Sequence, residues 1–206
     1  MNVIFVSGPH GCGKTGFMNS LLKDSDVFVK DEFYLDFVND LPAIEHMSIF
    51  EKCLLRLYHR FYTAEKAKLE CEKCNSNKII LVDRSIYDSM VYNVVEREMG
   101  TINEKQYRFL TDIAEKSLEI IKPYTIVLNP NSQGVVEYLQ QRRQKGERNK
   151  RDFLCSREDT TEYISMMHNE YKKLESVENV LCLSGSMDEN IQDTYNWIDK
   201  IIKKNA

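Results

Sequence analysis

Residues 8–15, Gly-Pro-His-Gly-Cys-Gly-Lys-Thr, match the phosphate-binding pattern Gly-x-x-x-x-Gly-Lys-Thr. The glycines of this pattern let successive backbone N–H groups turn toward one phosphate, and the following helix adds the positive end of its dipole. We expect Lys14 to reach the β- and γ-phosphates of a nucleoside triphosphate and the Thr15 hydroxyl to bind Mg²⁺. An apolar run before the loop and a helical pattern after it make a chance match of a glycine-rich turn the weaker interpretation.

A second charged motif, Asp83-Arg84-Ser85, ends another apolar run. A carboxylate at the end of a buried strand beside the loop is placed to hold Mg²⁺, so Thr15 and Asp83 are the expected metal ligands. Arg84 is placed to stabilise charge on a transferred phosphoryl group or to clamp an acceptor. The alternative is structural, with Asp83 or Ser85 capping the next helix.

Residues 142–151 carry six cations against a single acid, Glu147. Mutual repulsion opposes the ordering of such a cluster, and a bound triphosphate would relieve it. We therefore expect a lid at about residues 142–157 that closes over the nucleotide and opens for product release. A solvated basic helix end and, less favoured, a nucleic-acid-binding patch are the alternatives.

These motifs define an expected nucleotide site. His10 and Cys12 occupy free positions of the loop, and we interpret them as residues that the turn permits rather than as catalysts. The residues expected to contact the nucleotide are Gly8, His10, Gly11, Cys12, Gly13, Lys14, Thr15, Arg142 and Arg148.

The elements that must position these residues alternate along the chain. The sequence predicts strands at residues 2–7, 26–30, 78–83, 124–128 and 179–183. It predicts helices at residues 14–23, 44–70, 86–99, 103–121, 132–145, 160–174 and 187–203. This alternation implies a three-layer α/β fold, a five-stranded parallel sheet with helices on both faces. Such sheets bind ligands at the carboxyl ends of their strands, and residues 1–206 fit one domain.

Composition excludes several classes of function. The net charge of −4 gives no global positive field for nucleic acid or membrane surfaces, and no apolar run reaches the roughly 18 residues of a membrane span. The N-terminus lacks the features of a signal peptide, so we expect a cytoplasmic protein. Cys71 and Cys74 have metal-ligand spacing, but no second pair or histidine accompanies them, which favours free thiols at a surface helix end.

The segment from Asp83, Asp-Arg-Ser-Ile-Tyr-Asp-Ser-Met-Val-Tyr-Asn, resembles the Glu/Asp-Arg-Ser segment of deoxyribonucleoside kinases and is similar to the Asp-Arg segment of thymidylate kinases. The likeness continues through residues 100–107, 121–128 and 163–174. The resemblance implies a P-loop kinase fold with an arginine-bearing lid. It also implies that Asp83 and Arg84 lie between ATP and the acceptor. We expect Lys14 to act with them as a catalytic group, because it would neutralise charge on the transferring phosphoryl group.

The acceptor side departs from that family. Deoxynucleoside kinases place a Glu-Pro pair after the second strand, and its glutamate takes the proton from the sugar 5′-hydroxyl. Here Asp31-Glu32 stands at this place without the proline, so the resemblance implies Glu32 or Asp31 as the base. Asp88 stands one residue earlier than the family's aspartate, with Ser89 in its place.

The helix predicted from residue 44 carries aromatic and arginine side chains. They form either a pocket for a base or an ordinary core with a solvated face. These side chains are Phe50, Arg56, Tyr58, Arg60, Phe61 and Tyr62.

We therefore expect ATP- and Mg²⁺-dependent transfer of the γ-phosphoryl group to the 5′-hydroxyl of a (deoxy)nucleoside. The alternatives are a thymidylate-kinase-like nucleoside monophosphate kinase and, from another class, a P-loop ATPase or nucleotide-binding regulatory protein. The expected partner is a small-molecule acceptor rather than a membrane or nucleic acid, and a homodimer is left open.

Overall fold

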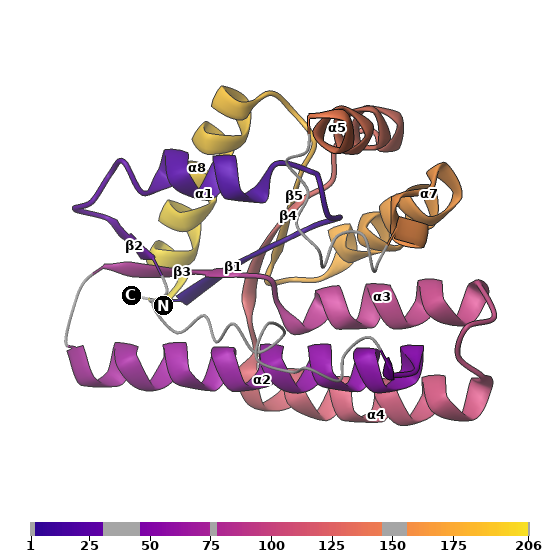
Figure 1. The fold of residues 1–206 in the computed structure, drawn as a ribbon. Coiled ribbons are helices and arrows are strands. Elements are labelled where there is room, and N and C mark those ends of the chain that lie inside the picture. The colour runs from indigo at the N-terminus through magenta and orange to yellow at the C-terminus, as the bar shows by residue number, and fades with distance from the viewer. Residues whose placement is uncertain (1–2, 31–45, 75–77, 146–155, 206) are drawn as a thin grey trace.

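The computed structural model describes residues 3–30, 46–74, 78–145 and 156–205 of the chain (Figure 1). Its strands form one parallel sheet in the order β2-β3-β1-β4-β5. The strands are β1 (Val3–Ser7), β2 (Phe28–Lys30), β3 (Ile79–Asp83), β4 (Tyr124–Leu128) and β5 (Val180–Leu183). Because β1 lies between β3 and β4, the strand order reverses at its carboxyl end, where such folds bind ligands.

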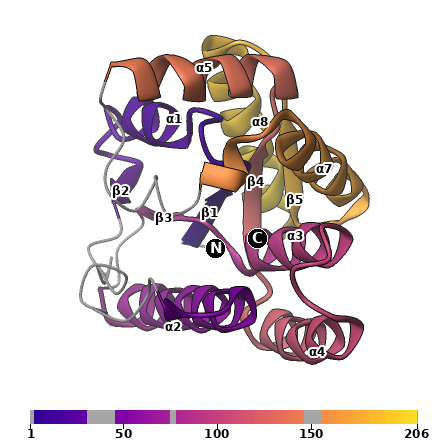
Figure 2. The ribbon, with the colours of Figure 1, turned by 45° about the vertical axis from the view of Figure 1, so that its right-hand side comes forward.

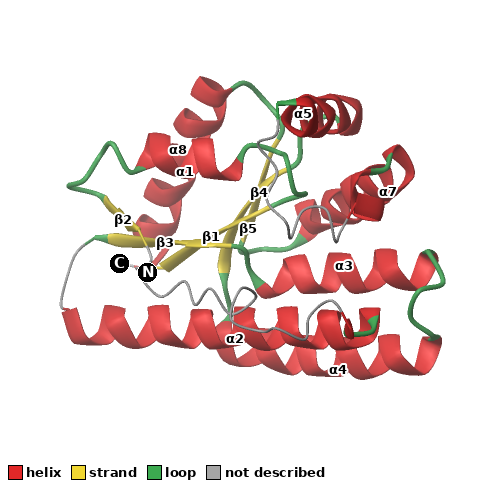
Figure 3. Cartoon of the chain, viewed as in Figure 1, coloured by secondary structure: helices red, strands yellow, loops and turns green. Residues whose placement is uncertain are grey.

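Helices cover both faces of this sheet (Figure 3). They are α1 (Lys14–Leu21), α2 (Ile49–Cys74), α3 (Ile86–Glu98), α4 (Glu104–Ile121), α5 (Ser132–Gln144), α7 (Thr161–Lys172) and α8 (Met187–Asn205), with short 3-10 helices η2 (Ser156–Asp159) and η3 (Lys173–Ser176). Helices α1 and α8 pack together on one face, and α2 and α3 cover the other, with α4 outside them (Figures 1 and 2). The three-layer fold with a five-stranded parallel sheet is confirmed.

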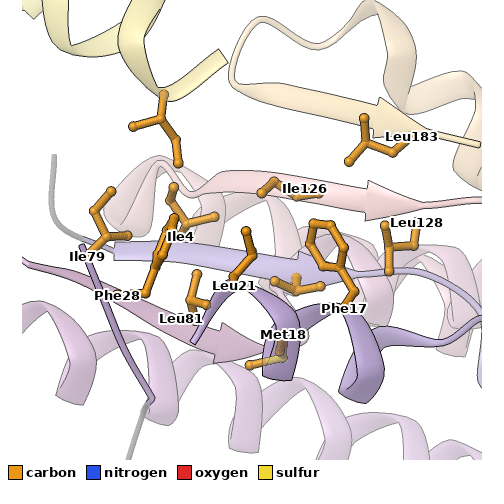
Figure 4. Close-up of a cluster of buried hydrophobic side chains, with 12 residues drawn as sticks. Ile4, Phe17, Met18, Leu21, Phe28, Ile79, Leu81, Ile126, Leu128 and Leu183 are labelled. Carbon is orange, nitrogen blue, oxygen red and sulfur yellow. The ribbon is translucent and has the colours of Figure 1, made fainter. Parts of the chain in front are cut away.

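Alternate strand residues form the cores on the two faces. Ile4 and Ile126 are fully buried against α1 and α8 (Figure 4). Phe5 packs instead against Ala64 of α2, and Val127 packs against α3 and α7. Burial on both faces explains why these strands are continuous apolar runs, since each buried side chain of this size stabilises the fold by roughly 1.5–3 kcal/mol.

The helix predicted at residues 44–70 begins later and ends later than expected. Residues 44 and 45 lie outside the described residues, and α2 begins at Ile49. Ser48 and Glu51 form reciprocal hydrogen bonds, with the Ser48 N–H donating to the Glu51 carboxylate at 2.6 Å and the Glu51 N–H donating to the Ser48 hydroxyl at 3.3 Å. This capping arrangement sets the first turn.

At its other end α2 runs to Cys74, so Cys71 and Cys74 lie in its last turn. Within the described ranges, no group of three or more His, Cys, Asp or Glu side chains is arranged to hold a metal ion. No described helix is long and apolar enough to cross a membrane.

Candidate active site

The glycine-rich loop connects the central strand β1 to α1. Gly8 has φ +135°, and a Cβ there would lie 2.2 Å from the Leu128 carbonyl oxygen, so only glycine lets the loop approach β4 this closely. Gly13 has φ +94° and is the N-cap residue of α1. No described side chain caps this helix, so its first N–H groups and the positive end of its dipole are directed into the loop. The loop therefore has the geometry of an anion site.

Lys14 places its ammonium group inside this loop. Its side chain is buried, and Nζ donates to the carbonyl oxygens of Gly8 at 2.9 Å and Pro9 at 2.6 Å. Cys12 Sγ lies 3.6 Å from the same nitrogen. Burial lowers the pKa of Lys14, and the positive charge of Arg84 lowers it further. A phosphate placed here would counter both effects, because its negative charge favours the protonated ammonium.

The Asp83-Arg84-Ser85 motif lies beside the loop because β3 pairs with β1, with Asp83 opposite Val6. Arg84 has φ +73°, which costs a non-glycine residue about 1–3 kcal/mol and is found mainly at functional sites. Its backbone N–H donates to the Val6 carbonyl at 2.9 Å, and its Nη1 donates to the Gly8 carbonyl at 3.2 Å. The turn thus directs the guanidinium at the first glycine of the loop.

Asp88 is the fully buried acid of this region. It accepts hydrogen bonds from Ser7, Gly8, Arg84, Ser85 and Tyr171. Burial acts to raise the pKa of its carboxyl, but the charges of Arg84, Arg60 and Lys14 outweigh burial and lower the pKa to about 2. Asp88 is therefore ionised at neutral pH and compensates the arginine beside the loop.

Three arginines surround the ring of Tyr92 on α3. The guanidinium carbons of Arg56, Arg60 and Arg84 lie 4.7, 5.5 and 5.7 Å from the ring centroid, within range of cation–π attraction. Arg56 also pairs with Glu158 of η2 at 2.6 Å. The two arginines of α2 are thus brought to the same ring as Arg84.

His10 connects the loop to other elements. Its Nδ1 lies 3.2 Å from the Tyr92 hydroxyl oxygen, and its Nε2 lies 3.2 Å from a carboxylate oxygen of Asp159. Arg143 of α5 also reaches Asp159, at 3.2 Å. The loop, α3, α5 and η2 are therefore joined through His10 and Asp159.

The sequence matches a known protein family along nearly its whole length. A family model described as deoxynucleoside kinase matches residues 4–205, nearly the whole chain. The chain belongs to the deoxynucleoside kinase family. It is therefore a nucleoside kinase, an enzyme that transfers a phosphoryl group, and the prediction of that family is confirmed. A comparison with curated protein sequences finds no match.

Solved structures agree at the level of the fold. The deoxyadenosine kinase from M. mycoides with bound dATP has a TM-score of 0.67 at 13% identity, with 97% of this chain and 100% of that chain covered. The same enzyme with the products dCMP and a flexible dCDP has a TM-score of 0.68 at 14% identity, with 96% and 99% covered. At these identities the likeness shows the fold alone.

In this deoxynucleoside kinase family member, some of the predicted site residues lie together and others fall outside the described residues. Gly8, Lys14 and Arg84 lie together at the carboxyl end of β1. Thr15 and Asp83 are exposed beside them. Gly11 and Cys12 are part of the same loop, where Gly11 packs against Leu139 of α5. Asp31, Glu32, Arg148 and the lid from residue 146 to 155 lie outside the described residues.

At the start of the expected lid, Arg142 lies over the ring of Tyr138 on its own helix, at 5.9 Å. Its neighbour Arg143 is the residue that reaches Asp159. His10, interpreted as a free position of the loop, links it to α3 and η2 instead.

Sequence reasoning missed several residues of the site. No sequence pattern marks Ser7, Glu158 or Tyr171 as a site residue, although each contacts a charged residue of the site. The spacing Ser85-x-x-Asp88 is a capping-box pattern, which indicates that Asp88 lies in the first turn of a helix. Tyr171 has no local signal, because it comes from a helix far along the chain.

Proposed function

We propose that the chain transfers the γ-phosphoryl group of ATP, with Mg²⁺, to the 5′-hydroxyl of a deoxynucleoside. The observation that carries this proposal is the position of Arg84. Its guanidinium contacts the Gly8 carbonyl of the donor loop and faces the Tyr92 ring, which also carries two arginines of α2. A cation between a donor loop and a second cluster of binding residues suits stabilisation of a phosphoryl group in transit.

The donor half combines the loop with an adjoining cavity. The loop N–H groups and Lys14 would bind the phosphates. A cavity of ≈ 120 Å³ opens beside the loop and is lined in part by Cys12, Pro130, Ser184, Gly185, Met187 and Asn190. Its mixture of apolar walls and a few polar groups suits a nucleotide base, and we assign it to the adenine of ATP.

Thr15 and Asp83 fit a Mg²⁺ site. Both offer oxygen ligands and both are exposed, as suits an ion that keeps several waters and few protein ligands. When bound, Mg²⁺ would neutralise charge on the β- and γ-phosphates. The protein's own part is to orient the phosphates through the loop and to hold Arg84 against the transferred group.

The acceptor half lies on the side of α2 and α3. Arg56 and Arg60 of α2 face Tyr92 of α3, and Arg60 Nη1 donates to the Ser89 hydroxyl at 2.6 Å. We assign this cluster to the acceptor, with Glu32 or Asp31 as the base for the 5′-hydroxyl. A nucleoside monophosphate is the second candidate acceptor, because Arg60 has no ion pair with any described carboxylate and would attract an anion.

The test is a panel of the four deoxynucleosides and their 5′-monophosphates with γ-labelled ATP, with and without Mg²⁺. We expect label on at least one deoxynucleoside and none without the metal. Arg84→Ala should lower kcat at least 100-fold while the Kd of ATP stays within threefold, with Arg108→Ala, an exposed arginine of α4, as the matched control. ATP hydrolysis that no acceptor stimulates would refute the proposal in favour of an ATPase.

We also propose a cytoplasmic location, where ATP is available, and a homodimer. The exposed side chains of Phe109 and Ile120 on α4 support the second, since apolar groups of this size favour burial in an interface. Light scattering after size exclusion tests the dimer, and a mass of one chain at all concentrations contradicts it.

A further inference from the structure

Asp88 connects three parts of the site through hydrogen bonds. Its Oδ2 accepts from the Ser7 hydroxyl at 2.6 Å and from the Ser85 N–H at 2.7 Å. Its Oδ1 accepts from Arg84 Nη1 at 3.0 Å, from the Tyr171 hydroxyl at 2.7 Å and from the Gly8 N–H at 3.3 Å. The donors come from the end of β1, the loop, the turn after β3 and α7, so both oxygens are occupied from separate directions.

Helix capping alone does not explain this arrangement. A capping box needs only the Ser85 N–H as donor to the carboxylate, and an ordinary capping carboxylate can remain in water. Asp88 is instead fully buried, and burying a charge is unfavourable unless every lone pair is satisfied. The additional donors Ser7, Gly8 and Tyr171 lie outside the helix that is capped.

The same bonds fix Arg84 relative to the loop. Arg84 Nη1 bonds both Asp88 Oδ1 and the Gly8 carbonyl, while the Gly8 N–H bonds Asp88. These three residues form a closed ring of hydrogen bonds in which the guanidinium cannot move without moving the carboxylate or the loop. Tyr171, fully buried on α7, donates to the same oxygen that holds Arg84 and so fixes the orientation of the carboxylate.

We propose that Asp88 is a positioning residue, which holds Arg84 against the phosphate loop, and that the Tyr171 hydroxyl orients Asp88 for this role. The inference rests on the proposed function of Arg84 in phosphoryl transfer and deepens it. In this role Asp88 acts through Arg84 and not directly on a reacting group. Its loss should therefore affect the rate of transfer much more than the binding of ATP, which depends on the loop N–H groups and Lys14.

The structure offers a matched pair of variants. Tyr171 and Tyr163 are both fully buried on α7, and each hydroxyl donates to a buried carboxylate of α3. Tyr171 donates to Asp88 at 2.7 Å and Tyr163 to Glu96 at 3.0 Å. Within the described residues, Glu96 has no hydrogen bond to Arg84 or to the loop. Tyr171→Phe and Tyr163→Phe therefore remove the same chemical group, but only the first affects the ring of hydrogen bonds at Arg84.

The experiment measures kcat, the Kd of ATP and the urea midpoint of each variant. We expect Tyr171→Phe to lower kcat about 10-fold with the Kd of ATP within threefold, and Tyr163→Phe to change kcat less than twofold despite a similar loss of stability. Asp88→Asn should lower kcat about 100-fold in the wild-type background and have no further effect on kcat in Arg84→Ala, because it acts through Arg84.

Two failures can be told apart. If Arg84→Ala keeps full kcat, the proposed function of Arg84 is wrong, and with it the inference. If Arg84→Ala loses activity but Tyr171→Phe resembles Tyr163→Phe, only the positioning role is overturned. A further loss of kcat from Asp88→Asn in the Arg84→Ala background also overturns it. Should Asp88→Asn fail to fold, the tyrosine pair decides alone.

Discussion

Substitution of glycines by alanine tests the shape of the phosphate loop directly. The loop needs Gly8 for two reasons, since φ is +135° and a Cβ would lie 2.2 Å from the Leu128 carbonyl oxygen. Position 13 requires glycine only for its backbone conformation. Its φ is +94°, but no atom would lie within 4 Å of an added Cβ. Gly134, in the first turn of α5, has neither constraint. The three positions thus separate steric contact from backbone strain.

The expected magnitudes follow from these differences. At Gly8 the dihedral costs about 1–3 kcal/mol. The contact adds about 1–3 kcal/mol, because two central strands must separate by roughly 1 Å to reach normal van der Waals distance. Gly13→Ala should cost only the dihedral, about 1–2 kcal/mol. Gly134→Ala should stabilise by about 0.5–1 kcal/mol, since alanine is the better helix former.

Urea unfolding followed by circular dichroism gives the free energies of unfolding, and calorimetry gives the Kd of ATP. The expected order of stability is Gly134→Ala, wild type, Gly13→Ala and Gly8→Ala, with ATP binding impaired in the last two. A Gly8→Ala protein as stable as Gly134→Ala, or less destabilised than Gly13→Ala, would refute the described contact between the loop and β4.

Three further predictions concern the charged residues around the loop. The pKa of Asp88 is lowered from 3.8 to about 2, so its contribution of about 2 kcal/mol to the free energy of unfolding is complete above pH 4 and is lost as the pH falls toward 2. Urea unfolding at a series of pH values should show this loss in wild type and not in Asp88→Asn. The same dependence of the free energy of unfolding on pH in both proteins would contradict the prediction. Because Arg84 has φ +73°, Arg84→Gly should be about 1 kcal/mol more stable than Arg84→Ala while both lose kcat equally, and the reverse order of urea midpoints argues against the strained turn. Glu158→Gln should lower the free energy of unfolding by about 3 kcal/mol, because it leaves Arg56 without its carboxylate. Adding Arg56→Met to this variant should restore most of that loss. Additive losses in the double-mutant cycle would show that the two residues are not coupled.

The fold could be predicted because few arrangements satisfy its sequence pattern. Short apolar runs separated by helical segments require a parallel sheet with crossovers, and β4 was predicted at its observed residues, 124–128. The start of α2 was missed for a local reason. Apolar residues continue the helical period before residue 49, but the mutual hydrogen bonds of Ser48 and Glu51 begin the helix there. Periodicity alone does not show where the backbone enters a helix.

The site could be predicted only where its residues are contiguous. The loop and Asp83-Arg84-Ser85 are local motifs, and the pairing of β1 with β3 brings them together as expected. The hydrogen bond from Tyr171 to Asp88 spans 83 residues, and that from Arg56 to Glu158 spans 102. Such contacts depend on the packing of α7 and η2 against α2 and α3, which no single segment encodes.

The cations of the site fall into two groups, those with an ion pair to a carboxylate and those without one. Asp88 compensates Arg84, and Glu158 compensates Arg56, so two partly buried cations are neutralised by the fold itself. Lys14 and Arg60 have no ion pair with any carboxylate in the described parts of the chain, and burial lowers the pKa of both. Lys14 lies in the glycine-rich loop, and Arg60 lies on α2 beside Tyr92. A buried charge without a direct ion pair is unfavourable. A ligand that brings negative charge or strong hydrogen-bond acceptors to these two cations would therefore stabilise them in a way that the protein alone does not.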